Sequence, residues 1–164
     1  MPTAAEIKKA LRDAGLEVYR TRGDVVYLAD RVRENLLMDA GIFLRAGEAA
    51  GPGGDASNER GMRVGFVVRA QRNDFPNDSE PHLFERARGL AAGAVALGYA
   101  ESGAEVRKVV DPGDGQRTLD TWCEVSFEKI VAGADLAAAV AEARFALTIE
   151  KCAPPKVDGS PPGS

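Results

Sequence analysis

The chain has 164 residues, of which 45% are hydrophobic and 28% are charged, and this suits one globular domain with a core of its own. Its net charge of −4 argues against binding to nucleic acid or to an anionic membrane, both of which call for a basic face. Two cysteines are too few for a disulfide scaffold, and no secretory signal or membrane-spanning apolar run is visible, so we expect a cytoplasmic protein.

The first part of the chain predicts one helix followed by extended segments. Thr3 and Glu6 form a capping-box pattern at the start of a helix over residues 4–14, in which apolar residues recur at helical spacing. Residues 17–22 and 24–32 are then expected to be extended, with a Gly-Asp turn between them.

Two strands with alternating apolar residues are predicted next, over residues 36–44 and 62–70. In the second of them Phe66 and Val68 face a core, and the opposite face is more polar. Residues 47–61 connect the two strands and are rich in glycine. We expect a flexible hairpin loop there rather than a phosphate-binding loop, because the segment leads into a strand and not into a helix.

A second helix is the clearest element of the sequence. It begins at a capping residue such as Ser79 and carries one apolar stripe over residues 83–95. Two further strands are predicted over residues 105–110 and 119–130, on either side of a Pro- and Gly-rich turn. Asp135 is placed to cap a last helix.

The predicted order is therefore α-β-β-β-α-β-β-α. Short turns between consecutive strands imply antiparallel pairing, and three amphipathic helices can cover one sheet face. We predict a single two-layer α+β domain over residues 1–152, an antiparallel sheet with three helices, followed by a disordered Pro-, Gly- and Ser-rich tail over residues 153–164. One core is expected to contain Phe66, Val68, Leu90, Val125 and Phe127.

This element order, the length and the acidic balance resemble those of class I type III secretion chaperones and of a related bacterial family, the sensory transduction regulators. The resemblance covers residues 3 to about 152 and rests on element order and patterning. It implies a non-enzymatic and often dimeric protein that holds an extended segment of a partner protein. The long loop over residues 47–61 and the Pro-rich tail depart from the family pattern.

The residue types that carry catalysis are sparse. The single histidine, His82, lies at a helix start without a nucleophile signature, so a surface position is expected. One histidine and two scattered cysteines do not make a zinc site, and Cys123 and Cys152 form no redox motif. Glu124 and Glu128 share a strand face, which we interpret as a charged outer face rather than an acid–base pair. We therefore expect no catalytic residue, no metal and no cofactor.

Trp122 is the residue that points to a partner. Alternation along the strand places Trp122 on the face that Cys123 does not share, and this face is otherwise polar. A large aromatic side chain in such a position often marks a contact surface, because Trp commonly anchors interfaces. Other residues on the minority face of their strands complete a candidate partner-binding surface, which consists of Trp122, Phe43, Leu37, Val67, Glu124 and Arg69. The alternative is that a β-bulge shifts the phase or that a helix also covers this face, which would place Trp122 in a core.

These observations predict a chaperone- or adaptor-like module that binds another protein and forms a homodimer, with neither nucleic acid nor membrane as a partner. The second hypothesis is a regulatory module that binds a small ligand, for example an anion between Arg69 and Arg72. An enzyme of unrecognised type is a third hypothesis, and it lacks a catalytic set. Copurifying protein would favour the first hypothesis, and thermal stabilisation by a metabolite would favour the second.

Overall fold

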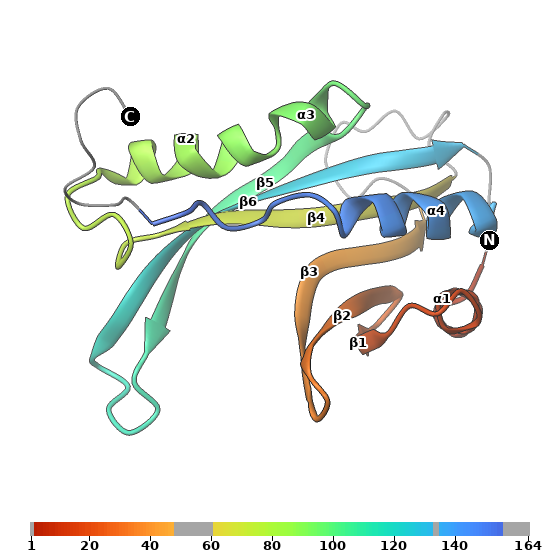
Figure 1. Cartoon of the computed structure of the whole chain (residues 1–164), viewed down its shortest axis with the longest axis horizontal. Helices are drawn as coiled ribbons and strands as arrows, with labels where there is room; N and C mark the ends of the chain where they lie inside the picture. The colour runs from red at the N-terminus through yellow and green to blue at the C-terminus, as the bar shows by residue number, and fades with distance from the viewer. Residues whose placement is uncertain (1, 48–60, 133–134, 156–164) are drawn as a thin grey trace.

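The computed structural model describes residues 2–47, 61–132 and 135–155 (Figure 1). In chain order the elements are α1 (Ala4–Asp13), β1 (Val18–Arg22), β2 (Val25–Arg33), β3 (Leu36–Gly47), β4 (Gly61–Gln71), α2 (Glu80–Leu90), α3 (Ala92–Val95), β5 (Ala100–Val110), β6 (Thr118–Ala132) and α4 (Leu136–Ala146).

The six strands form one sheet in the order β1-β2-β3-β4-β6-β5, and every neighbouring pair is antiparallel. The predicted two-layer α+β class is confirmed. The predicted element order counted one strand and one helix too few. Both segments predicted to be extended before residue 33 form strands, β1 and β2, and the expected second helix is divided at Ala91 into α2 and the short α3. β5 also begins at Ala100, five residues before the predicted start.

Local sequence signals fix where the helices begin. Thr3 and Glu6 make the predicted capping box, because the Thr3 hydroxyl accepts from the Glu6 N–H while the Glu6 carboxylate accepts from the Thr3 N–H. The Ser79 hydroxyl accepts from the His82 N–H at the start of α2, and Asp135 accepts from two N–H groups at the start of α4.

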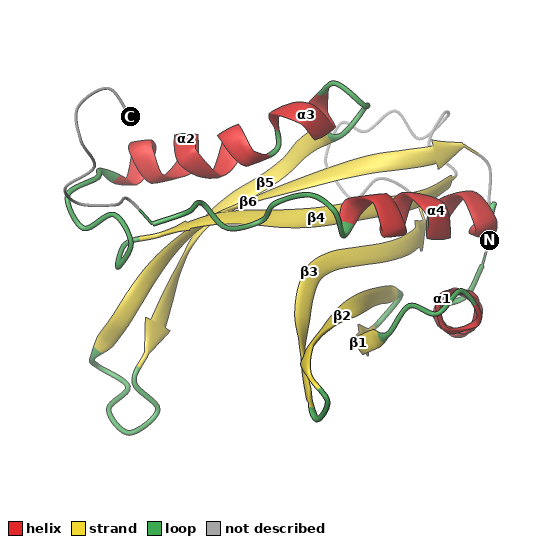
Figure 2. Ribbon diagram, viewed as in Figure 1, coloured by secondary structure: helices red, strands yellow, loops and turns green. Residues whose placement is uncertain are grey.

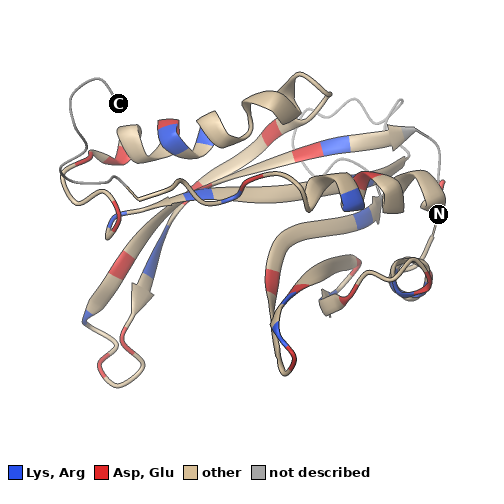
Figure 3. Ribbon diagram, in the orientation of Figure 1, with Lys and Arg blue, Asp and Glu red and all other residues tan. Residues whose placement is uncertain are grey.

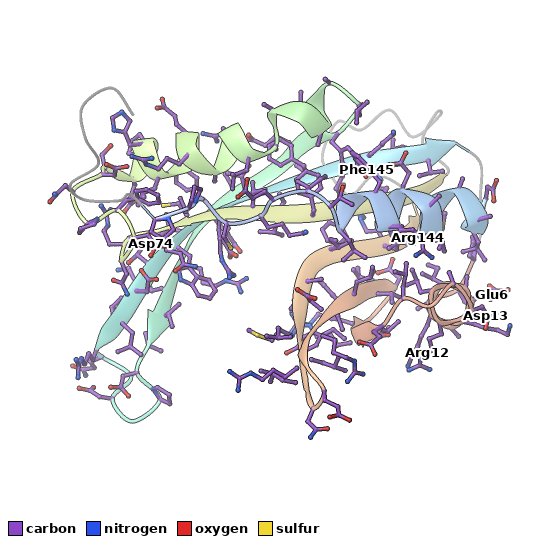
Figure 4. The ribbon with its side chains drawn as sticks, viewed as in Figure 1. Glu6, Arg12, Asp13, Asp74, Arg144 and Phe145 are labelled. Carbon is purple, nitrogen blue, oxygen red and sulfur yellow. The ribbon has the colours of Figure 1, made fainter. Side chains whose placement is uncertain are left out.

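The helices lie on one face of the curved sheet, where a single core forms (Figure 2). α1 contacts α4 and the first three strands, and the Arg144 guanidinium of α4 donates to the Ala14 carbonyl at 2.6 Å (Figure 4). The fully buried side chains include Ile7, Leu11, Val26, Leu28, Ile42, Leu44, Phe66 and Leu83. Four of the five predicted core residues are buried, whereas Leu90 is half-buried at the edge of this core.

β3 bends out of the sheet at Gly41, whose φ of 71° suits a residue without a Cβ atom. The Asp39 carboxylate accepts from the Gly41 N–H at 2.9 Å, and the register between β2 and β3 shifts at this point. β3 pairs with β4 only from Ile42 onward. Its first residues pair with β2 alone, so Leu36 and Met38 are exposed although they belong to the alternating apolar stripe of the sequence.

The C-terminal segment lies along the edge of β4 that β3 leaves open. The Arg69 N–H donates to the Lys151 carbonyl at 2.8 Å, and the Ala153 N–H donates to the Arg69 carbonyl at 3.2 Å. The two segments run parallel at this bridge, and Ala153 is buried. The prediction that disorder begins at Ala153 is therefore wrong for that residue. The rest of the predicted tail, from residue 156, and the predicted loop at 48–60 lie outside the described residues.

Two hairpin arms project from the sheet on the side away from α2, α3 and α4 (Figures 1 and 2). One arm is the β2–β3 hairpin beyond the bend at Gly41, and the other is the outer part of the β5–β6 hairpin. The central strands and the two arms together give the sheet a concave second face.

Candidate functional site

The concave face of the sheet holds a groove of about 1230 Å³ that runs between the two arms. Its lining comes from strands β1 to β6 and from the C-terminal segment, and side chains from both arms extend toward the space between them (Figure 4). The groove brings together all six residues of the candidate partner-binding surface, namely Leu37, Phe43, Val67, Arg69, Trp122 and Glu124.

Phe43 forms the apolar floor of the groove because its strand neighbour is a glycine. Phe43 and Gly65 are directly opposite each other in the β3–β4 pairing, and a Cβ atom at position 65 would lie 2.1 Å from the Phe43 Cζ atom. The ring therefore lies flat over the β4 backbone, where any side chain would displace it. Tyr27 on β2 extends the floor, with its ring centroid 6.1 Å from that of Phe43.

Trp122 lies at the other side of the floor and is held from two directions. Its indole N–H donates to the Asp120 carboxylate at 2.9 Å, and the Arg69 guanidinium carbon lies 4.2 Å from its ring centroid. Its chain neighbour Cys123 is fully buried on the helix-bearing face. The predicted alternation is thus confirmed, and Trp122 is half-buried in the groove rather than in the core.

Glu124 is the most buried charged residue of the groove, with only 6% of its surface exposed. Burial raises the pKa of its carboxyl group, and the nearby Arg107 and Arg69 oppose that rise. Arg107 Nε lies 3.0 Å from Glu124 Oε1, although not in line for a hydrogen bond. Among the described residues, Glu124 Oε1 and Arg69 Nε both lack a hydrogen-bond partner. This corner of the groove therefore holds one unmet acceptor and one unmet donor.

A second charged cluster lies further along β6, around Glu128. Arg45 contacts both carboxylate oxygens of Glu128, with its NH2 nitrogen 3.0 Å from Oε2, and Arg63 NH1 lies 3.3 Å from the same oxygen. These ion pairs are almost out of solvent, and they link side chains of β3 and β4 to β6. Charges of both signs also follow the two arms (Figure 3).

The predicted anion pocket between Arg69 and Arg72 does not form. The Arg69 guanidinium lies over Trp122 in the groove, whereas the Arg72 guanidinium donates to the Asp78 carbonyl and does not line the groove. The two residues are separated because Arg72 lies in the turn after β4, where its guanidinium group contacts the segment that leads into α2.

Several groove residues were not predicted from the sequence. Tyr27 and Arg107 belong to the groove through strand pairing, and their alternation with Val26 and Val106 is the signal that was available. Lys151 lines the groove from a segment that has no periodic pattern, so only the folded chain brings it there. Burial lowers the pKa of its ammonium group, and Asp30 opposes that effect.

The single histidine does not line the groove. His82 is exposed near the start of α2, where its ring lies 3.9 Å from the Glu85 carboxylate. In the described part of the chain, no three or more His, Cys, Asp or Glu side chains gather where they could hold a metal ion. No helix within the described ranges is long and apolar enough to cross a membrane.

Comparison with known proteins identified no family model, no curated protein and no solved structure that matches this chain.

Proposed function

We propose that this chain is a non-enzymatic protein-binding module, chaperone- or adaptor-like, that holds an extended segment of a partner protein in the concave groove. The observation that carries the proposal is the gathering of Phe43, Val67 and Trp122 from three strands on the sheet face opposite the helices. An aromatic and apolar floor with a charged rim is how proteins commonly anchor one another, with Trp and Arg prominent among the strongest contacts.

The size of the groove suits an extended segment. It crosses the sheet from β1 to β5, and five strand spacings of about 4.8 Å give a span on the order of 24 Å. A chain in extended conformation covers that distance with about seven residues. Such a segment places alternate side chains on the floor and leaves the others toward solvent.

The polar groups of the groove also support a peptide occupant. Glu124 Oε1 is buried without a hydrogen bond, and Arg69 Nε lacks an acceptor. Leaving such groups unmet costs free energy, so an occupant that supplies both a donor and an acceptor is favoured. A peptide backbone supplies one N–H and one C=O with each residue. A basic side chain beside Glu124 adds charge complementarity.

The test begins with capture from the native cell, followed by measurement on the purified pair. Tagged wild-type chain and the Trp122→Ala variant are used as baits, together with Leu97→Ala as a control. Leu97 is exposed and does not line the groove. A partner retained by the wild type and by Leu97→Ala is then purified and titrated against all three. We expect Trp122→Ala to weaken binding by about 30-fold or more, equivalent to about 2 kcal/mol. Equal binding by the folded Trp122→Ala protein would contradict the proposal.

A small-ligand regulatory module is the second candidate, and the corner formed by Arg69, Trp122 and Glu124 favours it. This corner combines an aromatic face with an unmet donor and an unmet acceptor. The groove as a whole is larger than the roughly 300–1,000 Å³ of ordinary ligand pockets, which favours the peptide. Thermal stabilisation of the wild type by one metabolite of a panel, lost in Arg69→Ala and Trp122→Ala, would support the small ligand instead.

A further inference from the structure

The outer strand β5 has a free edge along the sheet. β5 pairs with β6 on one side only, and no other described strand lies on its opposite side. Residues 103–109 keep an unbroken register with β6, and the pairing becomes irregular only at either end of this stretch. Proteins usually protect such an edge with bulges, prolines or a covering element, because its N–H and C=O groups can pair with another chain.

One symmetric arrangement pairs all seven residues of this regular stretch with their counterparts, and it is self-complementary in charge. When two identical strands pair antiparallel in one sheet, the two-fold axis that relates them is perpendicular to the sheet, and each side chain stays on its own face. Residues that lie opposite each other must therefore share a face, so the axis lies at the level of one residue, which pairs with its own copy. With the axis at Val106, Glu105 lies opposite Arg107 of the second copy, and Arg107 lies opposite its Glu105. With the axis at Glu105 or at Arg107, identical charges meet at the axis itself. Opposite charges across a strand pair stabilise it, and like charges destabilise it.

We propose that β5 pairs antiparallel with β5 of a second copy of this chain about a two-fold axis through Val106. Within one copy, Glu105 and Arg107 pair with each other at 3.4 Å, and Arg107 also pairs with Glu124. Their side chains are nevertheless 67% and 58% exposed, which leaves them accessible to a second copy. Val106 is 39% exposed and belongs to the helix-bearing face, opposite Cys123 of β6. The pairing covers its side chain with that of its symmetry mate.

The resulting dimer has one continuous sheet of twelve strands, because each copy contributes six. The two-fold axis is perpendicular to the sheet, so both concave grooves open to the same side. A contact of about seven residues per strand is small for a stable interface, and we expect a reversible dimer that dissociates in the micromolar range. The proposal does not depend on which molecule occupies the groove, although Glu105 and Arg107 also line it.

Sedimentation velocity over a range of concentrations tests the pairing through a charge swap. The wild-type chain should show a concentration-dependent monomer–dimer equilibrium. In the Glu105→Arg dimer the introduced arginine of each copy lies opposite Arg107 of the other copy, which makes two like-charged pairs. The dissociation constant of the dimer should therefore rise at least about tenfold. The double variant Glu105→Arg/Arg107→Glu is made in a Glu124→Gln background, so that the introduced glutamate does not face the buried Glu124 carboxylate. It restores the opposite pairs, and its dissociation constant should return to within about threefold of the value for Glu124→Gln alone.

Glu34→Arg is the matched control, because it makes the same change in net charge at an exposed site in the β2–β3 turn. It should leave the equilibrium unchanged. A general effect of net charge would act the other way, since making a chain of charge −4 less negative reduces repulsion between copies. Thermal melting of each variant confirms that it is folded. A wild-type chain that stays monomeric, an unaffected Glu105→Arg dimer, or a folded double variant without recovery would each overturn the proposal.

Discussion

At the scale of single residues, Glu124 links the groove to the stability of the fold. Its carboxyl group is almost fully buried, and burial raises its pKa above the ordinary value of 4.5. An acid with a raised pKa binds protons more readily in the folded state than in the unfolded state. Its contribution to folding is therefore fully present below the unfolded pKa and is lost as pH rises through the folded pKa.

The first prediction follows from the direction of this pKa shift. As pH rises above 4.5, the wild type should lose free energy of unfolding relative to the Glu124→Gln variant, which has no charge to bury. Urea denaturation of both proteins at several pH values measures the difference. Glu150→Gln is the control, since Glu150 lines the same groove but is exposed and is not among the groups that shift the Glu124 pKa. Parallel curves for the wild type and Glu124→Gln would show that the carboxyl group is not desolvated in solution.

Gly65 gives a second prediction at the residue scale. A methyl group at this position would meet the Phe43 ring at a distance that no folded structure tolerates. Gly65→Ala should therefore move the ring, disturb its contact with Tyr27 and cost about 1–3 kcal/mol, as overpacking usually does. Gly103→Ala is the control, because nothing lies within 4 Å of a Cβ atom there. Chemical denaturation measures both effects, and equal stability of the two variants would contradict the close approach.

At the scale of elements, the C-terminal segment forms a short parallel bridge to β4. It takes the place of the pairing that β3 gives up at Gly41. The positive φ of Gly41 allows the bend of β3, whereas a Cβ atom there would make only ordinary contacts, at 3.4 Å from Lys151 Cδ and 3.5 Å from the Val67 carbonyl.

A truncation series tests this role. Ending the chain after Glu150 removes the hydrogen bonds to Arg69 and the buried Ala153, and should lower the free energy of unfolding by about 2–3 kcal/mol. Ending it after Pro155 retains these contacts and should change stability little, because the Pro-, Gly- and Ser-rich residues beyond it have a composition that buries little apolar surface. A similar loss of unfolding free energy in both truncations would mean that the contacts of residues 151–153 do not account for it.

Periodicity predicted most of the elements, because a strand or helix that buries one face shows it in every second or every third to fourth residue. It could not reveal the bend of β3. The apolar alternation continues through Leu36 and Met38, although these residues lie exposed in the β2–β3 arm, away from the core. It also could not predict the pairing of Lys151 with β4, which depends on contacts between residues far apart in the chain.

The alternation of residues along the strands also predicted part of the groove. Trp122, Phe43 and Val67 stood out as large apolar residues on the polar face of their strands. Arg107 did not, because a charged residue on a strand is ordinarily solvated. Its place beside Glu124 follows from the register of β5 on β6.

At the scale of the whole molecule, the two faces of one sheet have separate tasks. The helix-bearing face holds the core, and the concave face holds the groove. β6 serves both, because Phe127 lies 3% exposed in the core while Trp122 lies half-buried in the groove. Substitutions on this one strand should therefore separate stability from recognition.

The last prediction compares Phe127→Ala with Trp122→Ala. Phe127 stacks on Phe66 at 5.5 Å between ring centroids, so its truncation should cost about 3–5 kcal/mol of unfolding free energy. Trp122 contacts Arg69 and Asp120 at the surface of the groove, and its truncation should cost about 1 kcal/mol or less. Partner binding should show the opposite order at a temperature where both variants are folded, with Trp122→Ala defective and Phe127→Ala close to the wild type. Calorimetric melting and titration on the same samples measure both quantities. A large loss of stability in Trp122→Ala with intact binding would place Trp122 in a structural role and leave the groove without its anchor.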